Sequence, residues 1–306
     1  PVFKQTLWGG SRLREAFGYD TPGDNTGECW AISSHPNGDC TVASGPYAGM
    51  TLSALWSEHR ELFGNLPGDH YPLLVKLIDA REDLSVQVHP DDDYAREHEN
   101  GASGKTEFWY ILDCPENAEI VIGHKANDHQ EMEAMIRSGR WEEFIRRIPI
   151  EKGGFFQIDP GCVHSIRAGT MLIETQQNSD ITYRVYDYDR LSNGKPRELH
   201  LEKSIDVIKA PYVPAQFFSW QTRGNGYERT TLISCSCYTI NRLVLRGEAT
   251  FEQTEPFLNV SVIEGEGAVD GIHVRKGDHF ILPAGYGYYT LTGDMTLITS
   301  GMPADQ

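Results

Sequence analysis

The sequence lacks the features of a disulfide-stapled or membrane-spanning protein. Its 306 residues include only 6 cysteines, and no two of them form a C-x-x-C pair. We therefore expect buried, reduced thiols in place of disulfides or thiolate metal ligands. No apolar run approaches the roughly 18 residues of a membrane span, and Pro1–Gly10 lacks the basic and then apolar layout of a signal peptide. These absences predict a cytoplasmic protein with no membrane partner.

Basic residues are scarce as well. Lys and Arg number 27 against 44 Asp and Glu, which leaves a formal charge of -17 at pH 7. Binding of nucleic acid or of an acidic membrane requires basic surface, so neither partner is expected. A small anionic substrate is compatible with this charge if a few Lys and Arg side chains cluster in one site.

Short strands dominate the pattern that is present. A length of 306 residues suits two domains of roughly 150 residues each. Two segments, 51–65 and 127–147, predict amphipathic helices because their apolar side chains recur at helical spacing. Elsewhere short apolar runs alternate with Gly, Pro and Asn, which is typical of a sandwich or barrel. The runs that predict strands are 73–79, 84–89, 106–112, 120–123, 154–158, 170–175 and 182–186.

An internal echo indicates two related modules. Residues 152–166 (KGGFFQIDPGCVHSI) and 276–291 (KGDHFILPAGYGYYTL) both run Lys-Gly, a short strand, a Pro/Gly turn and a second strand. This order is similar to the second motif of cupin barrels, in which the last strand carries a histidine into the barrel interior. His164 has that place in the first copy and Tyr288 in the second, so the second module is predicted to lack metal ligands.

These patterns predict a mainly β chain of two cupin-like (jelly-roll) β-barrel modules with a small helical insertion. A Pro-rich passage at 210–214 marks the junction. We therefore divide the chain into a metal-binding catalytic domain, 1–209, and a C-terminal cupin-like domain, 210–306.

The strongest local signal is a strand with two polar side chains on one face. In the run V-Q-V-H-P, residues 86–90, alternation places Gln87 and His89 on one face and the valines on the other. Burying two such groups without partners would cost about 1 to 3 kcal/mol each. A metal ion would satisfy both, and a hydrogen-bonded core Gln and His is the alternative that this motif leaves open.

A carboxylate on another strand extends this set. Glu107 opens the apolar run E-F-W-Y-I-L, where a charged side chain is rarely buried without a partner, although a solvated strand entry is the alternative. With His89 and His164 it makes a His/His/Glu set with Gln87 in addition. Zinc accepts imidazole and carboxylate ligands and keeps a position open for substrate. Iron or manganese uses the same residue types, so the set does not fix the metal.

Four motifs in order resemble the type I phosphomannose isomerases, most closely the short bacterial members. The motifs are SVQVHPDD, GKTEFWYILDC, PGCVHSI and IETQQNSDITYRVYDYDR. The resemblance covers most of residues 5–200, including L-W-G-G at 7–10, and weakens over the C-terminal module. It implies one zinc ion per chain and the interconversion of mannose 6-phosphate and fructose 6-phosphate through an enediol.

The same resemblance implies roles for individual residues. The zinc ligands it assigns are Gln87, His89, Glu107 and His164. The family's active-site arginine falls on Arg184, ten residues after the strand glutamate Glu174. Longer members carry a histidine where this chain has Gly104, so the role of that histidine is not transferred. They carry a lysine where this chain has Arg190, which we assign with Glu174 to substrate binding.

The chemistry itself requires cations and a base. Moving a proton between C2 and C1 builds negative charge on the carbonyl oxygen, which nearby cations stabilise. We assign this chemistry to Lys76, Lys105, Asp180 and Arg184. Lys76 interrupts an apolar strand, and a solvent-reaching stem or a pair with Asp79 is its alternative. Asp180 either acts as the base or orients Arg184.

Two other protein classes share parts of this pattern. A different metal-dependent cupin enzyme, such as a dioxygenase, would use a similar ligand set without needing the Lys and Arg side chains. A non-catalytic sugar-binding cupin would bind its ligand without turnover. Metal analysis combined with oxygen-uptake and isomerase assays separates the three classes.

Overall fold

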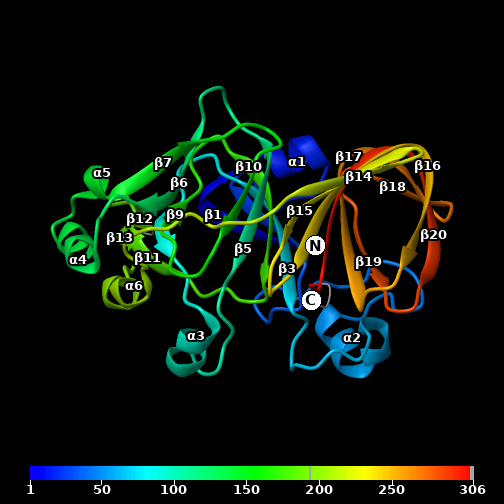
Figure 1. Cartoon of the computed structure of the whole chain (residues 1–306), viewed down its shortest axis with the longest axis horizontal. Coiled ribbons are helices and arrows are strands. Elements are labelled where there is room, and N and C mark those ends of the chain that lie inside the picture. The colour runs from blue at the N-terminus through cyan, green and yellow to red at the C-terminus, as the bar shows by residue number, and fades with distance from the viewer. Residues whose placement is uncertain (193, 304–306) are drawn as a thin grey trace.

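The chain folds into three large antiparallel sheets with helices at their margins (Figure 1). The computed structural model describes residues 1–192 and 194–303. Strands predominate over helices, as the sequence predicts. None of the described helices is both long and apolar enough to cross a membrane.

The first sheet contains two strands that are buried along most of their length. These are β3 (Leu73–Asp79) and β10 (Met171–Gln177), whose near-continuous apolar sequences suit burial on both faces. The full order is β1 (Val2–Gly10), β2 (Thr26–Ile32), β3, β10, β5 (Glu107–Asp113) and β8 (Phe155–Ile158).

The second sheet lies against the first and is made of shorter strands. Its order is β11 (Tyr183–Tyr186), β4 (Val86–Val88), β9 (His164–Ser165), β6 (Glu119–His124) and β7 (Ile145–Pro149). A separate two-stranded ribbon, β12 (Leu191–Ser192) with β13 (Lys195–Pro196), follows β11 in the chain.

The third sheet is built from the C-terminal part of the chain, on the right in Figure 1. Its order is β14 (Trp220–Gly224), β15 (Tyr227–Ser234), β16 (Thr239–Gln253), β20 (Gly287–Gly301), β17 (Phe257–Val269) and β18 (Ile272–Arg275), and β19 (His279–Pro283) also pairs with β17. Among the described strands, none from the first 209 residues pairs with one of this sheet. The domain boundary at 210 stays a prediction. The last three residues of the predicted C-terminal domain, 304–306, lie outside the described part.

Helices are short and lie outside the sheets. The elements are α1 (Arg12–Phe17), α2 (Leu52–Glu58), the 3-10 turn η1 (Arg60–Phe63), α3 (Asp92–His98), α4 (His129–Arg137), α5 (Trp141–Phe144) and α6 (Leu201–Val207). The predicted helix at 51–65 is confirmed as α2 followed by η1.

The predicted helix at 127–147 is wrong at its C-terminal end. Helix α4 stops before Gly139, whose φ of 66° ends the helical path, and α5 adds one more turn. The next residues form β7 and pair with β6. Ile145 is buried, and the residues after it alternate between half-buried and exposed. Exposure along Arg146–Pro149 alternates with the strand period of 2, whereas the apolar residues Ile145 and Ile148 are three apart, a spacing that also fits a helix.

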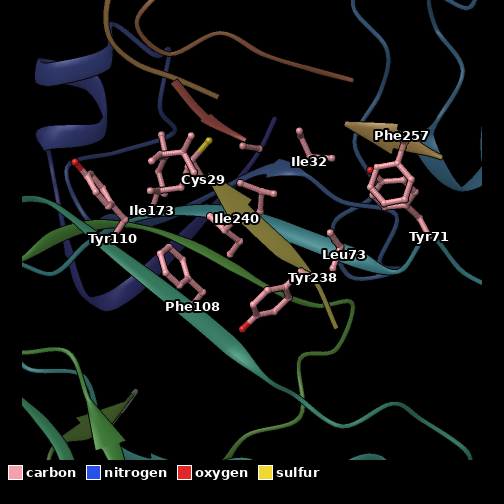
Figure 2. Close-up of a cluster of buried hydrophobic side chains, with 14 of the residues drawn as sticks. Cys29, Ile32, Tyr71, Leu73, Phe108, Tyr110, Ile173, Tyr238, Ile240 and Phe257 are labelled. Atoms are coloured by element: carbon pink, nitrogen blue, oxygen red, sulfur yellow. The ribbon is translucent and has the colours of Figure 1, made fainter. Parts of the chain in front are cut away.

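A shared hydrophobic core joins the third sheet to the first. Figure 2 shows Tyr238, Ile240 and Phe257 from the C-terminal region among Phe108 and Tyr71 from the N-terminal region. All these side chains are almost fully buried. The two halves therefore bury apolar surface against each other, and the third sheet packs against the apolar side chains of β5.

Tyr288 does not point into a barrel interior as the internal echo suggests. Its side chain is 73% exposed, whereas the next residue, Tyr289, is 7% exposed and lies in the core of the third sheet. Strand alternation along β20 puts the two on opposite faces. All 6 cysteines are free thiols, as expected, but Cys114, Cys235 and Cys237 are only partly buried.

Candidate functional site

A cavity of about 680 Å³ is lined by residues of the first two sheets. Seven predicted site residues line it, namely Lys76, Gln87, Lys105, Glu107, Glu174, Asp180 and Arg184. His89 and His164 are not among the lining residues, and both are buried beside Glu107. Arg190 is not among the lining residues.

His89, Glu107 and His164 converge on one point. One ligand atom from each lies within 4.8 Å of the others. His89 Nε2 is 3.2 Å from Glu107 Oε1, and His164 Nε2 is 3.5 Å from Glu107 Oε2. The carboxamide nitrogen of Gln87 is 3.2 Å from His164 Nε2, so the fourth residue of the predicted set is adjacent.

Hydrogen bonds to backbone carbonyl groups fix both imidazoles in the same tautomer, with the proton on Nδ1. His89 Nδ1 donates to the carbonyl oxygen of Ile181 at 2.7 Å, and His164 Nδ1 donates to that of Cys162 at 2.9 Å. Each Nε2 therefore turns an acceptor lone pair toward Glu107, which is the usual arrangement of metal-binding histidines. Burial, with Lys105 nearby, lowers the pKa of His89 to about 3, and burial lowers the pKa of His164 as well. Both rings are neutral, as a metal requires.

An orphaned carboxylate oxygen tests whether these residues fit a metal ion. Glu107 Oε2 is buried and has no hydrogen-bond donor among the described residues. A buried carboxylate oxygen facing two imidazole acceptors is costly unless a cation satisfies all three. Mixed nitrogen and oxygen donors of this kind suit zinc and other divalent transition metals. The residues present fit such an ion.

Strand register explains why distant residues meet. On the second sheet Gln87 pairs with Arg184 on one side and with His164 on the other. Directly paired residues project from the same face about 5 Å apart. On the first sheet Glu174 pairs with Lys76 and with Trp109 in the same way. One sheet thus presents imidazole, amide and guanidinium groups, and the other presents carboxylates and ammonium groups.

Two lysines and two glutamates form a buried charge cluster next to the imidazoles. Lys105 Nζ donates to Glu107 and lies 3.6 Å from Glu174 Oε1, while Lys76 Nζ is 3.9 Å from the same oxygen. Burial and the Glu107 carboxylate raise the pKa of Glu174. Burial also opposes ionisation of Glu107, yet Lys105 and His89 hold its pKa well below its usual range. The environment thus pushes the two carboxyl pKa values apart, the pattern of an acid and base pair.

The alternative partner of Lys76 is excluded by the geometry. Asp79 accepts hydrogen bonds from the backbone N–H and Nε of Arg12, at 2.8 and 2.7 Å. Lys76 faces Glu174 and lies 5.1 Å from the centre of the Trp30 ring. It is therefore a buried member of the cavity wall.

Asp180 is held by a loop and not by Arg184. It accepts a hydrogen bond of 2.6 Å from Asn37 Nδ2 and lies 3.5 Å from His35 Nε2. Among the described residues no ion pair joins it to Arg184. Of its two suggested roles, the orienting one therefore has no supporting contact.

Arg184, Arg190 and Arg197 lie close together, and the last two bind Asp187. Arg184 Nη1 donates to the carbonyl oxygen of Glu198 at 2.8 Å, and its buried Nε has no acceptor among the described residues. Arg197 contacts the Asp187 carboxylate and lines the cavity. Arg190 binds the other side of Asp187 and lies over the Tyr188 ring. Burial and the charge of Arg197 lower the pKa of Arg184, which indicates how close the guanidinium groups are.

The sequence analysis missed Arg197. A signal was present, because the Asn-Gly dipeptide at 193–194 favours a tight hairpin. The paired strands β12 and β13 flank that dipeptide and return the chain to the cavity. Glu28 and Trp30, which also line the cavity, lie on β2 and were missed because that strand mixes polar and apolar residues.

The surroundings of Gly104 explain why this chain has glycine where longer members of the family have a histidine. A Cβ atom there would lie 2.5 Å from the backbone carbon of Asp91 and 2.6 Å from the backbone nitrogen of Asp92. The start of α3 therefore packs directly on this glycine, and Asp92 Oδ1 accepts its N–H at 2.8 Å. No side chain fits at this position without moving the helix.

Comparisons with known proteins agree over the whole chain. Residues 1–123 match the family model described as phosphomannose isomerase type I, catalytic domain, and residues 228–302 match mannose-6-phosphate isomerase, cupin domain. The chain is 50% identical over 305 residues to mannose-6-phosphate isomerase ManA of Bacillus subtilis, covering 98% of this chain and 96% of that one. It is 45% identical over 310 residues to the mannose-6-phosphate isomerase of Streptococcus mutans, covering 98% of each. The crystal structure of the Bacillus subtilis enzyme matches with a TM-score of 0.97 at 50% identity, covering 98% of both chains.

Proposed function

The chain belongs to the type I phosphomannose isomerase family, and from this premise we propose how its cavity interconverts mannose 6-phosphate and fructose 6-phosphate. The protein is an aldose-ketose isomerase. The observation that carries the proposal is that one cavity is lined by Glu107 of the His/Glu/His cluster, by a buried Lys-Glu pair and by two arginines. Iron-dependent oxidation would not require those cationic groups.

Zn²⁺ is the ion that we assign to His89, Glu107 and His164, with Gln87 as the fourth ligand. Bound there, it supplies a Lewis acid that polarises the carbonyl oxygen of the open-chain sugar. The neutral Nε2 acceptors and the orphaned Glu107 oxygen support this assignment. The choice of zinc over iron or manganese rests on the family resemblance, because the donor types suit all three metals.

Lys105 and Glu174 are the residues that we assign to the proton transfer. Lys105 keeps its charge, because the two nearby carboxylates outweigh its burial and raise its pKa. Its ammonium group can donate to the sugar oxygen that gains negative charge in the enediol. Burial and the Glu107 carboxylate raise the pKa of Glu174 to about 8, and in its ionised form Glu174 takes the proton from C2 and returns it to C1. Lys76 holds the Glu174 carboxyl in place from the other side.

Arg184 and Arg197 are the residues that we assign to the phosphate group. Both line the cavity, and Arg184 offers an unused N–H. Planar guanidinium groups bind phosphate oxygens in pairs, which gives orientation as well as charge. A phosphate held there would place the rest of the sugar in the same cavity as Lys105 and Glu174. Asp180 lines the wall between and is available to a sugar hydroxyl.

A coupled isomerase assay tests this proposal directly. Purified protein should convert mannose 6-phosphate to fructose 6-phosphate, lose activity after treatment with a chelator and regain it best with Zn²⁺. The His164→Ala variant should contain less than one tenth of the parent's metal and should be inactive, because a ligand has been removed. His59→Ala is the matched control, since His59 lies outside the cavity beside Glu61. Full turnover by a preparation free of metal would refute the assignment.

A further inference from the structure

A hairpin of the C-terminal sheet brings two cysteines to the edge of the active site. Strands β15 and β16 are joined by the tip C-S-C-Y, residues 235–238, where Cys235 N–H donates to the carbonyl oxygen of Tyr238 at 2.9 Å. Cys237 Sγ lies 3.7 Å from the Thr106 hydroxyl. Thr106 stands between Lys105 and Glu107 in the chain, so the hairpin contacts the segment that leads from Lys105 into β5.

The hairpin tip is firmly attached to the catalytic sheet. The buried Tyr238 hydroxyl donates to Gln157 Oε1 on β8 at 3.0 Å. Figure 2 shows Tyr238 in the same buried cluster as Phe108, the residue that follows Glu107. A change in the conformation of the tip should therefore also move β5 and β8, because the tip cannot move independently of them.

The two thiols are in unlike environments. Hydrogen bonding between them raises the pKa of Cys235 and lowers that of Cys237, with Thr106 and Ser236 also favouring the Cys237 thiolate. Both side chains are only partly buried, so a small oxidant can reach them. In contrast, burial raises the thiol pKa of the other four cysteines, which are Cys29, Cys40, Cys114 and Cys162. A reactive cysteine combines thiolate character with access, and Cys237 has both.

We propose that Cys235 and Cys237 form a peroxide-sensitive thiol pair that closes to an intramolecular disulfide and reversibly lowers the isomerase activity. The two residues are separated by one position in a tight turn, which keeps their Cα atoms within the span that a disulfide bridges. The proposal requires no residue of the cavity itself to be oxidised.

The reaction is balanced with hydrogen peroxide as the oxidant. The Cys237 thiolate attacks one peroxide oxygen, so that an S–O bond forms, the O–O bond breaks and hydroxide leaves and becomes water on protonation. The Cys235 thiol then attacks the Cys237 sulfenic acid, so that the S–S bond forms, the S–O bond breaks and a second water leaves. Two thiols thus supply the two electrons that reduce one peroxide to two waters.

Disulfide closure acts on the site through Thr106. Drawing Cys237 toward Cys235 removes the sulfur from the Thr106 hydroxyl and pulls on the neighbouring Tyr238 anchor. We expect kcat/KM to fall by about tenfold, the size of effect that follows when a hydrogen bond to an ionised group is lost beside a site.

The experiment treats the metal-loaded enzyme with a small excess of hydrogen peroxide and then blocks the remaining thiols before peptide mass analysis. The peptide that contains residues 235–237 should lose two hydrogens, kcat/KM should fall, and dithiothreitol should reverse both changes. Cys235→Ser should stop at a sulfenic acid that dimedone traps on Cys237. Cys237→Ser, which keeps a hydroxyl beside Thr106, should be active and resistant to peroxide.

Cys114→Ser is the matched control, because Cys114 is partly buried but has a raised pKa and lies away from the hairpin. This variant should remain as sensitive to peroxide as the parent. The proposal is overturned if oxidation maps to other cysteines, if Cys237 forms only intermolecular disulfides, or if Cys237→Ser loses activity as fast as the parent. Peptide mass analysis detects the disulfide whatever reaction the enzyme catalyses. Failure of the proposed isomerase function would therefore not be mistaken for failure of the thiol pair.

Discussion

Arg184 has the most informative side-chain environment in the cavity. Its backbone is in register with Gln87, yet its buried Nε has no acceptor among the described residues. An unused guanidinium N–H in a buried position is a cost to folding that a bound anion removes. This favours a role on the substrate and not in the fold.

Replacing Arg184 should therefore separate turnover from stability. Arg184→Ala should retain metal and near-normal thermal stability while losing a factor of about 10² to 10³ in kcat/KM. Arg184→Lys should recover only part of the activity, because an ammonium group cannot make the paired contact of a guanidinium. The measurements are kcat/KM, metal content and Tm for both variants. A metal-free or unfolded Arg184→Ala protein would make the residue structural.

Arg190 and Arg197 give a second contrast, because both bind Asp187 but only Arg197 lines the cavity. Arg197→Ala should raise the KM for mannose 6-phosphate by about tenfold, as expected from loss of a charged contact to phosphate. Arg190→Ala should change KM much less, although the sequence assigned phosphate binding to it. Inhibition by inorganic phosphate should weaken in parallel with KM. Equal effects of the two changes would show that the Asp187 cluster acts as one unit.

Most site residues were predictable because polar groups on apolar strands stand out. Gln87, His89, Glu107 and Lys76 each interrupt a run that burial would otherwise make apolar. Arg197 gave no such contrast, since it follows a short exposed ribbon in a polar segment. Its place in the cavity depends on where the hairpin returns, and that is a tertiary property.

Strands with a continuous apolar or a clearly alternating pattern were likewise predictable, and strands of mixed sequence were not. The range of β3 is recovered fully, because seven consecutive buried positions leave a continuous apolar signal. Strands β1 and β2 were missed, because β1 mixes exposed and half-buried residues and β2 includes Gly27 and Glu28. The end of the predicted helix at 127–147 was placed too late. The mixed residues there fit the period of a helix as well as that of a strand, and only Gly139 indicates that the helix ends.

The packing of α3 on Gly104 predicts a steric effect on the catalytic strand. Gly104→Ala should destabilise the protein by about 1 to 3 kcal/mol, the typical cost of overpacking, because the added methyl meets backbone atoms that cannot rotate away. Lys105 is the next residue, so kcat should fall as well. Ser103→Ala, at an exposed neighbouring position, is the control for denaturant unfolding and kinetics. A fully stable and active Gly104→Ala enzyme would mean that α3 is free to shift.

At the scale of the whole molecule, the two halves act as a single packed body. Core residues of the C-terminal sheet pack on the sheet that carries Glu107 and Glu174, and the hairpin tip reaches β5 and β8. This packing gives the C-terminal sheet a supporting role behind the strand that carries Glu107. Cytoplasmic location and the absence of a nucleic-acid partner stay predictions from composition.

A partly buried contact between the two halves should make the stability of the whole chain depend on pH. Tyr19 donates to the carbonyl oxygen of Gly277 and accepts from His279 Nε2, each at 2.8 Å, and His279 Nδ1 accepts from the Ser261 hydroxyl at 2.8 Å. The neutral ring is thus fully satisfied. Burial, with a small contribution from the N-terminal ammonium, lowers the pKa of His279 to about 3.

The sign of the effect follows from which state binds the proton. Between pH 6.5, the ordinary pKa, and about 3, the unfolded chain protonates His279 and the folded chain does not. Acidification through this window therefore favours unfolding, and the stability is fully present above it. His279→Gln keeps a donor and an acceptor but cannot titrate. Between pH 7 and pH 5 the parent should lose about 1 kcal/mol more unfolding free energy than this variant, with partial exposure of the ring reducing the ideal value. Urea unfolding at both pH values measures the difference, and parallel losses in the two proteins would show that His279 is not the group responsible.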